Sequence, residues 1–198
     1  MRREEGKLNR LIITVFVLAA ALSTLLAFLI FRSPKRSEPV YQIQAELTPE
    51  NPPSEGERMR VRLYFLSPST GNLEMEERLI PAQRNPAETA RAIINELSAG
   101  SRKGLISPVP PGITLRAVFI DRSNRIYLDF PSSATLKIPR SPESEIEFLS
   151  AILSTIKVNL PRVREAQILV DGHNAETLAG CLDLSLPIPI DDFLREVL

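Results

Sequence analysis

The chain has 198 residues, and its 24 Lys and Arg balance its 24 Asp and Glu. A neutral chain with 6% aromatic residues and no Trp argues against a nucleic-acid partner, which would need a basic stripe and stacking platforms. The single cysteine, Cys181, excludes an intrachain disulfide and a cysteine-rich metal site, and its apolar neighbours predict a packed side chain rather than a reactive thiol.

The most distinctive segment is the apolar run at residues 11–31, which follows a ten-residue stub at 1–10. Its 21 positions contain no charge, Pro, Gly, Asn or Gln, and a bilayer crossing needs ~20 apolar residues. A cleaved signal peptide is the first alternative, with Ala19–Ala21 as its cleavage signal, but cleavage there would leave an apolar new terminus. A buried core helix is the second, but it would show a polar face. We therefore predict an uncleaved single-pass anchor.

The charges beside the run bear on its orientation. Four cationic residues precede it and Arg32, Lys35 and Arg36 follow it, which is a small positive-inside bias. This bias favours a cytoplasmic N-terminus and an extracytoplasmic domain. Residues 32–59 are rich in Pro, Ser and Glu and predict an extended linker between the anchor and that domain.

The folded part begins at residue 60 with a predicted hairpin, whose strands at 60–65 and 73–80 flank a Ser-Pro-Ser-Thr-Gly-Asn turn. In the second strand Leu73, Met75 and Leu79 alternate with glutamates. Glu74, Glu76 and Glu77 are interpreted as the solvated face of this strand.

Two helices carry clear start signals. Asn85 and Pro86 begin the first, which ends at Gly100, and Ser141 and Pro142 begin the second, which ends before Pro161. In the second helix Ile146, Leu149, Ile152, Leu153 and Ile156 mark the buried face, and Glu143, Glu147, Ser150 and Lys157 lie opposite. Strands are predicted at 113–120, 125–130 and 166–170, and an acidic tail with a last helical turn or two at 188–198.

The succession ββ-α-ββ-α-β predicts an α+β domain at 60–187, with a mixed β-sheet and two helices packed on one face of it. The sequence of this domain shows no clear pattern of catalytic or metal-binding residues. His173 is the only histidine, and no nucleophile signature accompanies it, so an exposed turn residue is favoured over a general base. No metal-ligand spacing and no phosphate-binding glycine loop is visible. We therefore predict no catalytic residue, no cofactor and no metal.

The order and spacing of several passages resemble the GerMN domain of sporulation and spore-germination proteins of the GerM type. These passages are VRLYF at 61–65, NPAETARAIINEL at 85–97, VPPGITLRAVFI at 109–120, IYLDF at 126–130, AILSTI at 151–156 and QILVDG at 167–172. The resemblance singles out six residues with structural roles in turns and at strand ends, namely Pro111, Gly112, Asp129, Asp171, Gly172 and Gly180.

The resemblance implies a non-enzymatic, extracytoplasmic module in sporulation or spore germination. Residues 86–172 are also similar to ring-building motifs of envelope secretion assemblies, which implies protein–protein contacts near the peptidoglycan. The better-known GerM-type proteins have two copies of the domain and a lipid anchor, whereas this chain has one copy and a predicted transmembrane helix. The expected partners are the membrane, through residues 11–31, and envelope proteins; binding or remodelling of peptidoglycan is the alternative function.

Overall fold

The computed structural model describes residues 56–197. The predicted stub at 1–10, the predicted anchor at 11–31 and most of the predicted linker at 32–59 lie outside the described residues. Within residues 56–197, no helix combines the length and the apolar character that a membrane crossing needs.

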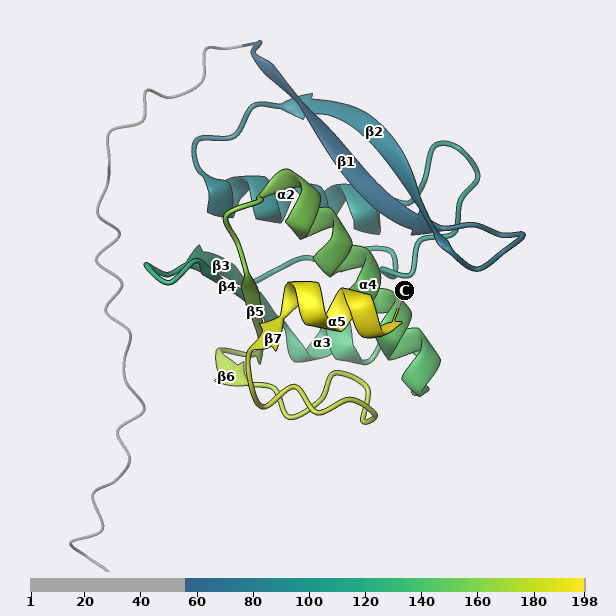
Figure 1. Ribbon diagram of the computed structural model, residues 1–198, viewed down its shortest axis with the longest axis vertical. Helices are drawn as coiled ribbons and strands as arrows, with labels where there is room; N and C mark the ends of the chain where they lie inside the picture. Colours follow the sequence, from purple (N-terminus) through teal and green to yellow (C-terminus); the bar gives the residue numbers. More distant parts are fainter. Residues whose placement is uncertain (1–55, 198) are drawn as a thin grey trace, which may run out of the picture. The chain divides into compact units, whose positions relative to one another are not determined.

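The described part is an α+β domain, as predicted, and its main elements follow the predicted order ββ-α-ββ-α-β (Figure 1). The structure adds a one-turn helix, two short strands and a C-terminal helix to this order. In chain order the elements are β1 (Arg58–Leu66), β2 (Leu73–Pro81), α2 (Pro86–Ser98), β3 (Ala117–Ile120), β4 (Arg125–Phe130), α3 (Ser132–Thr135), α4 (Pro142–Asn159), β5 (Glu165–Val170), β6 (His173–Asn174), β7 (Ile188–Pro189) and α5 (Ile190–Val197).

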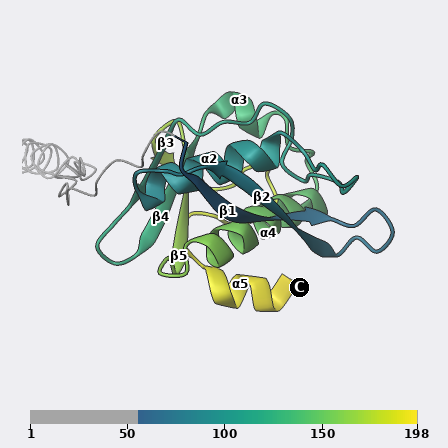
Figure 2. The ribbon, with the colours of Figure 1, turned by 90° about the horizontal axis from the view of Figure 1, so that it is seen from above.

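The strands form two sheets rather than the single mixed sheet that the sequence predicted. The five-stranded sheet is mixed: β4 pairs with β3 antiparallel and with β5 in parallel, and β5 also pairs with β6 and β7. The hairpin β1–β2 is a separate antiparallel sheet. It covers one side of α2 and α4, while the mixed sheet lies on another side of these helices (Figures 1 and 2).

The predicted helix starts are present. The Asn85 side chain accepts a hydrogen bond from the Glu88 N–H at 2.9 Å, and the Ser141 hydroxyl accepts one from the Ser144 N–H at 3.1 Å. Each bond satisfies one of the first backbone donors of a helix, and a proline follows each cap at the first helical position.

Helix α4 is buried on more sides than its sequence indicates. Ser150 was placed on the exposed side, but residues 148–156 are all buried. The reason is that α4 lies between the hairpin and α5, with the mixed sheet beside it (Figure 2). The aromatic ring of Phe148 packs against Phe130 of β4, with ring centroids 5.7 Å apart, and joins α4 to the main core.

The second strand of the hairpin has the opposite facing to the predicted one. Met75 and Leu79 are 45% and 55% exposed, whereas Glu76 and Arg78 are almost fully buried. The interpretation of Glu76 as a solvated side chain is therefore wrong, and that of Glu74 and Glu77 is confirmed. A charged face can be buried here because each charge finds a partner from a distant segment.

Two further differences concern the ends of elements. The strand predicted at 113–120 is reduced to β3, although Ile113 and Leu115 ahead of it are still buried. The segment 188–197 was predicted as an acidic tail outside the domain with a last helical turn or two. The helical turns are present as α5, but the segment packs onto the domain: β7 pairs with β5, and Ile190 and Leu194 of α5 are buried.

Candidate functional site

Three of the six residues that the resemblance singled out meet at the ends of β4 and β5. The buried Asp129 carboxylate accepts the N–H of Gly172 at 2.9 Å. The guanidinium nitrogen Nη1 of Arg116 lies 3.5 Å from a carboxylate oxygen of Asp129 and 3.3 Å from one of Asp171. Asp171 and Gly172 both have positive φ, of 51° and 83°, so the chain turns sharply here as it leaves β5. This cluster therefore ties the turn between the antiparallel strands β5 and β6 to the end of β4.

The Asp171 carboxylate is engaged within the same cluster. It accepts the N–H of Ser132 at the start of α3, and hydrogen bonds from Ser132 together with the charge of Arg116 hold the pKa of Asp171 below its usual range. A carboxylate so held stays ionised and acts as an acceptor for backbone groups.

The other three residues lie in two different turns. Lys137 lies 3.2 Å from the carbonyl oxygens of both Pro111 and Gly112, and Gly112 has a φ of +72°. Gly180, with a φ of +99°, lies in the loop between β6 and β7. The structure therefore distributes the six residues over three turns and does not bring them into one pocket.

The loop around Gly180 is organised by Glu145, a residue that the sequence analysis did not single out. Glu145 is fully buried, and its two carboxylate oxygens accept the N–H groups of Leu178, Ala179, Cys181 and Leu182 at 2.8 to 3.2 Å. From the sequence it is one of several acidic residues in the first turn of a helix. The four donors come from a loop more than 30 residues away, so no local pattern indicates them.

A second buried ionic group joins the hairpin to the end of α2. The Arg78 guanidinium lies 2.7 Å from a carboxylate oxygen of Glu76 and 2.8 Å from one of Glu96. The Glu76 carboxylate also accepts hydrogen bonds from the Ser101 hydroxyl at 2.6 Å and from the Arg102 N–H at 3.1 Å. Burial by itself raises the pKa of the Glu76 carboxyl, but the hydrogen bonds from Ser101, Arg78 and Arg102 outweigh it and lower the pKa below its usual range.

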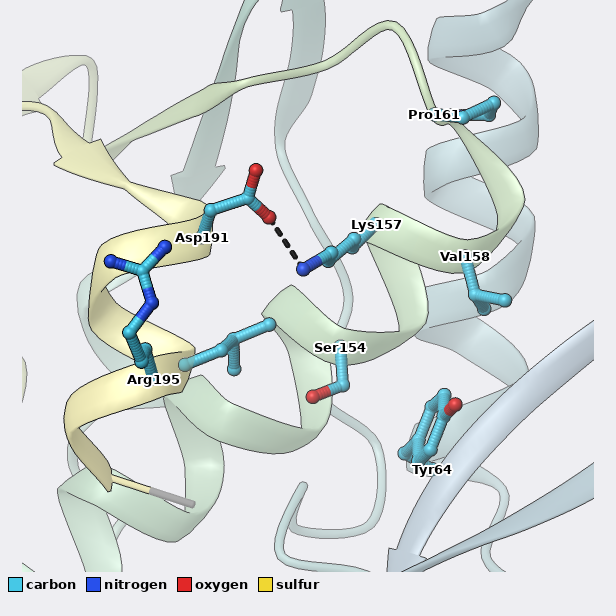
Figure 3. A pocket seen from close by; sticks show the side chains of 8 residues that line it. Tyr64, Ser154, Lys157, Val158, Pro161, Asp191 and Arg195 are labelled. Atoms are coloured by element: carbon cyan, nitrogen blue, oxygen red, sulfur yellow. Dashed lines mark ion pairs between the residues drawn. The ribbon is translucent and has the colours of Figure 1, made fainter.

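A groove between β1, α4 and α5 has a volume of about 870 Å³ and combines hydroxyl, charged and apolar groups (Figure 3). Lys157 of α4 pairs with Asp191 of α5 at 2.5 Å, which holds the pKa of Asp191 below its usual range. The hydroxyl of Ser154 is buried without a hydrogen-bond partner in the described structure. The groove is lined by Tyr64, Ser154, Lys157, Val158, Pro161, Asp191, Leu194 and Arg195.

The remaining candidates for chemistry are on the surface. His173 is exposed and its Nδ1 lies 3.0 Å from the carbonyl oxygen of Asp171, in agreement with the prediction of an exposed turn residue. Cys181 is exposed, so the prediction of a packed thiol is wrong: its backbone N–H points inward to Glu145 and its side chain outward. Within residues 56–197, no group of three or more His, Cys, Asp or Glu side chains is placed to hold a metal ion.

The geometry can be compared with solved structures. The tandem GerMN domains of the sporulation protein GerM from Bacillus subtilis match with a TM-score of 0.57 and 16% identity, over 69% of this chain and 48% of that chain. The first GerMN domain of the same protein matches with a TM-score of 0.52 and 15% identity, over 66% of this chain and 97% of that chain. A candidate lipoprotein from Clostridium perfringens matches with 24% identity and a TM-score of 0.48, over 68% of this chain and 89% of that chain.

The two Bacillus subtilis structures show that the domain has the fold of a GerMN domain. No curated protein matches the chain in sequence. The family model described as Germane, sporulation and spore germination, matches residues 62–176, which is more than half of the chain and runs from β1 to the turn after β6. The chain therefore belongs to the Germane family of sporulation and spore germination and carries a GerMN-type domain.

Proposed function

We propose that this chain is a non-catalytic interaction module that takes part in sporulation or spore germination from the outer side of the cytoplasmic membrane. The observation that carries the proposal is the Germane match over residues 62–176, in a chain whose residues 11–31 are long and apolar enough to span a bilayer. In this proposal the anchor and the Pro-rich linker hold the domain where it meets other envelope proteins.

The use of the buried carboxylates supports a non-catalytic role. Glu145, Asp129 and Glu76 each accept two or more hydrogen bonds or ion pairs from backbone groups, arginines or a serine of the same chain. A general acid or base needs a carboxyl group that can reach a substrate. These three are instead committed to holding loops and strands together.

The proposed location can be tested with the native cysteine, because Cys181 is exposed. A membrane-impermeant maleimide applied to intact cells should label the full-length protein at Cys181, and the variant Cys181→Ser should remain unlabelled. Labelling only after lysis would place the domain in the cytoplasm and contradict the proposal.

The proposed role can be tested in sporulating cells. Crosslinking followed by recovery of the tagged full-length protein should enrich a small set of envelope proteins, relative to cells that lack the tag. Deletion of the gene should lower the yield of heat-resistant spores or slow their germination. Recovery of no envelope protein, together with normal sporulation and germination, would refute the interaction role.

A second candidate function, binding of peptidoglycan, is favoured by the groove between β1, α4 and α5. It presents the Tyr64 ring and the Arg195 guanidinium, a combination that suits a sugar with a carboxylate-bearing peptide. The full-length protein should then sediment with purified sacculi, and Arg195→Ala should reduce this while Arg84→Ala, at an exposed site outside the groove, should not. Equal amounts in the supernatant with and without sacculi would eliminate this function.

A further inference from the structure

The hairpin has two outer edges, which differ in whether their backbone groups have hydrogen-bond partners. On the outer edge of β1, the Asn159 side chain accepts the Arg62 N–H at 3.0 Å and donates to the Arg62 carbonyl at 2.6 Å, and Thr155 accepts the Tyr64 N–H at 3.0 Å. Further along, Leu66 exchanges two backbone hydrogen bonds with Ile106. The outer edge of β1 is therefore capped by α4 and by the loop after α2.

The outer edge of β2 has no such cover within the described residues. β2 has β1 on one side and no strand on the other, over nine residues. Two backbone hydrogen bonds lie at the ends of the β1–β2 ladder, from the Ser67 N–H to the Asn72 carbonyl and from the Ala82 N–H to the Glu57 carbonyl. They show which residues of β2 direct their backbone groups toward β1. Even-numbered residues of β2 therefore bond to β1, while the N–H and C=O groups of Met75, Glu77 and Leu79 point away from it.

A long, unpaired strand edge is a template for another strand, and proteins usually protect such edges. On β2 the outward-facing groups belong to the same residues whose side chains are exposed: Met75 is 45% and Leu79 is 55% exposed. An added strand would thus find both backbone partners and two apolar side chains at alternate positions.

The surroundings of this edge are cationic. A depression of about 480 Å³ runs along it, between the hairpin and the loop that follows α2. Five of its lining residues are cationic and two are anionic, but Arg78 is buried and already paired with Glu76 and Glu96. The other four cationic residues are exposed, and Arg60 and Arg102 are each 68% exposed. The lining residues are Arg58, Arg60, Glu76, Glu77, Arg78, Leu79, Arg102 and Lys103.

We propose that the outer edge of β2 binds an extended acidic segment of a partner protein by strand addition. This rests on the proposed function and names the kind of partner. The backbone of the segment would pair with Met75, Glu77 and Leu79, and its carboxylates would meet Arg102 and Lys103. A second copy of this chain fits less well, because antiparallel pairing of two β2 edges would bring the same cationic depression against itself.

The test uses the full-length protein in detergent micelles and a fluorescein-labelled peptide with alternating Glu and Val, read by fluorescence anisotropy. We expect binding that weakens as salt increases, and little binding of the matching Lys and Val peptide. Met75→Pro removes an outward N–H that bonds to no strand, so the hairpin should persist and the affinity should fall about tenfold or more. The matched control Met75→Thr keeps the N–H and should bind within about twofold of wild type, given the small contribution of one exposed side chain.

Hydrogen exchange gives an independent readout of the same edge. The N–H groups of Met75, Glu77 and Leu79 should exchange rapidly in the free full-length protein and become protected when the Glu and Val peptide is added. Three results would overturn the proposal: protection without peptide, which would mean that the chain's own residues outside the described part cover the edge; a dimer that Met75→Pro dissociates; or equal binding of both peptides. If crosslinking in cells still recovers envelope proteins, the proposed function stands and only the β2 assignment fails.

Discussion

Removal of the Glu145 carboxylate should loosen the loop between β6 and β7 and destabilise the whole domain. In Glu145→Ala, four N–H groups lose their acceptors, and those of Leu178 and Ala179 are bonded in fully buried surroundings. Each buried donor left without a partner costs about 1–3 kcal/mol, while water can reach the partly buried Cys181 and Leu182 donors. The expected loss is therefore about 3–5 kcal/mol, out of a typical total of about 5–15 kcal/mol.

Urea denaturation of the full-length protein, followed by far-UV circular dichroism, measures this loss. Glu145→Gln keeps one acceptor oxygen and should lose about half as much, because its amide group faces two of the four donors. Glu143→Ala is the matched control: it removes an exposed carboxylate from the same helical turn and should change the free energy of unfolding by no more than about 0.5 kcal/mol. Hydrogen exchange should rise at residues 178–182 in Glu145→Ala alone. If this variant lost less than about 1 kcal/mol with unchanged exchange there, the loop would be held by its apolar contacts and our reasoning would be refuted.

Three further predictions concern the hairpin and the core. The lowered pKa of Glu76 means that its contribution to stability is present above the ordinary glutamate pKa of about 4.3 and is lost as pH falls through the folded-state value. Urea titrations between about pH 3 and 7 should therefore show that the free energy of unfolding falls less steeply at acid pH in Glu76→Gln than in wild type. An unchanged dependence on pH would show that other carboxyl groups dominate. Asn159→Ala should lose about 0.5–1.5 kcal/mol, because water can reach the exposed Arg62 groups, and should speed exchange of the Arg62 N–H; unaltered exchange there would mean that α4 does not cap β1. Phe148→Ala should lose about 3–5 kcal/mol in the same denaturation assay, and a loss under about 1 kcal/mol would contradict its place in the core.

The helices and the mixed sheet show how far the sequence could predict the fold. Asn85 and Ser141 were found because a cap, a following proline and an apolar stripe are all local signals. The strand 125–130 was found in full because it is bounded by a turn and a proline. The separation of the hairpin from the mixed sheet was not found, because it depends on Asn159 and Thr155, which lie more than 90 residues from the strand that they cap.

The candidate sites show the same contrast between local signals, which the sequence reveals, and contacts between distant segments, which it does not. Gly112 and Gly172 were recognisable as turn residues, and both have the positive φ that favours glycine. The roles of Glu145 and Glu76 could not be recognised, since each is one acidic residue among several in its own element. Only the fold brings their donors to them.

The sequence by itself therefore determined the α+β class, the order of the main elements, the turns and the expectation of a membrane anchor. These depend on hydrophobic periodicity, on caps and on backbone conformation, which act over a few residues. The tertiary structure alone decided which face of β2 is buried, which carboxylates organise the loops, and which strand edge is left open. The alternation in β2 permits either facing, and the choice was made by Ser101 and Arg102, whose groups solvate the Glu76 carboxylate in place of water.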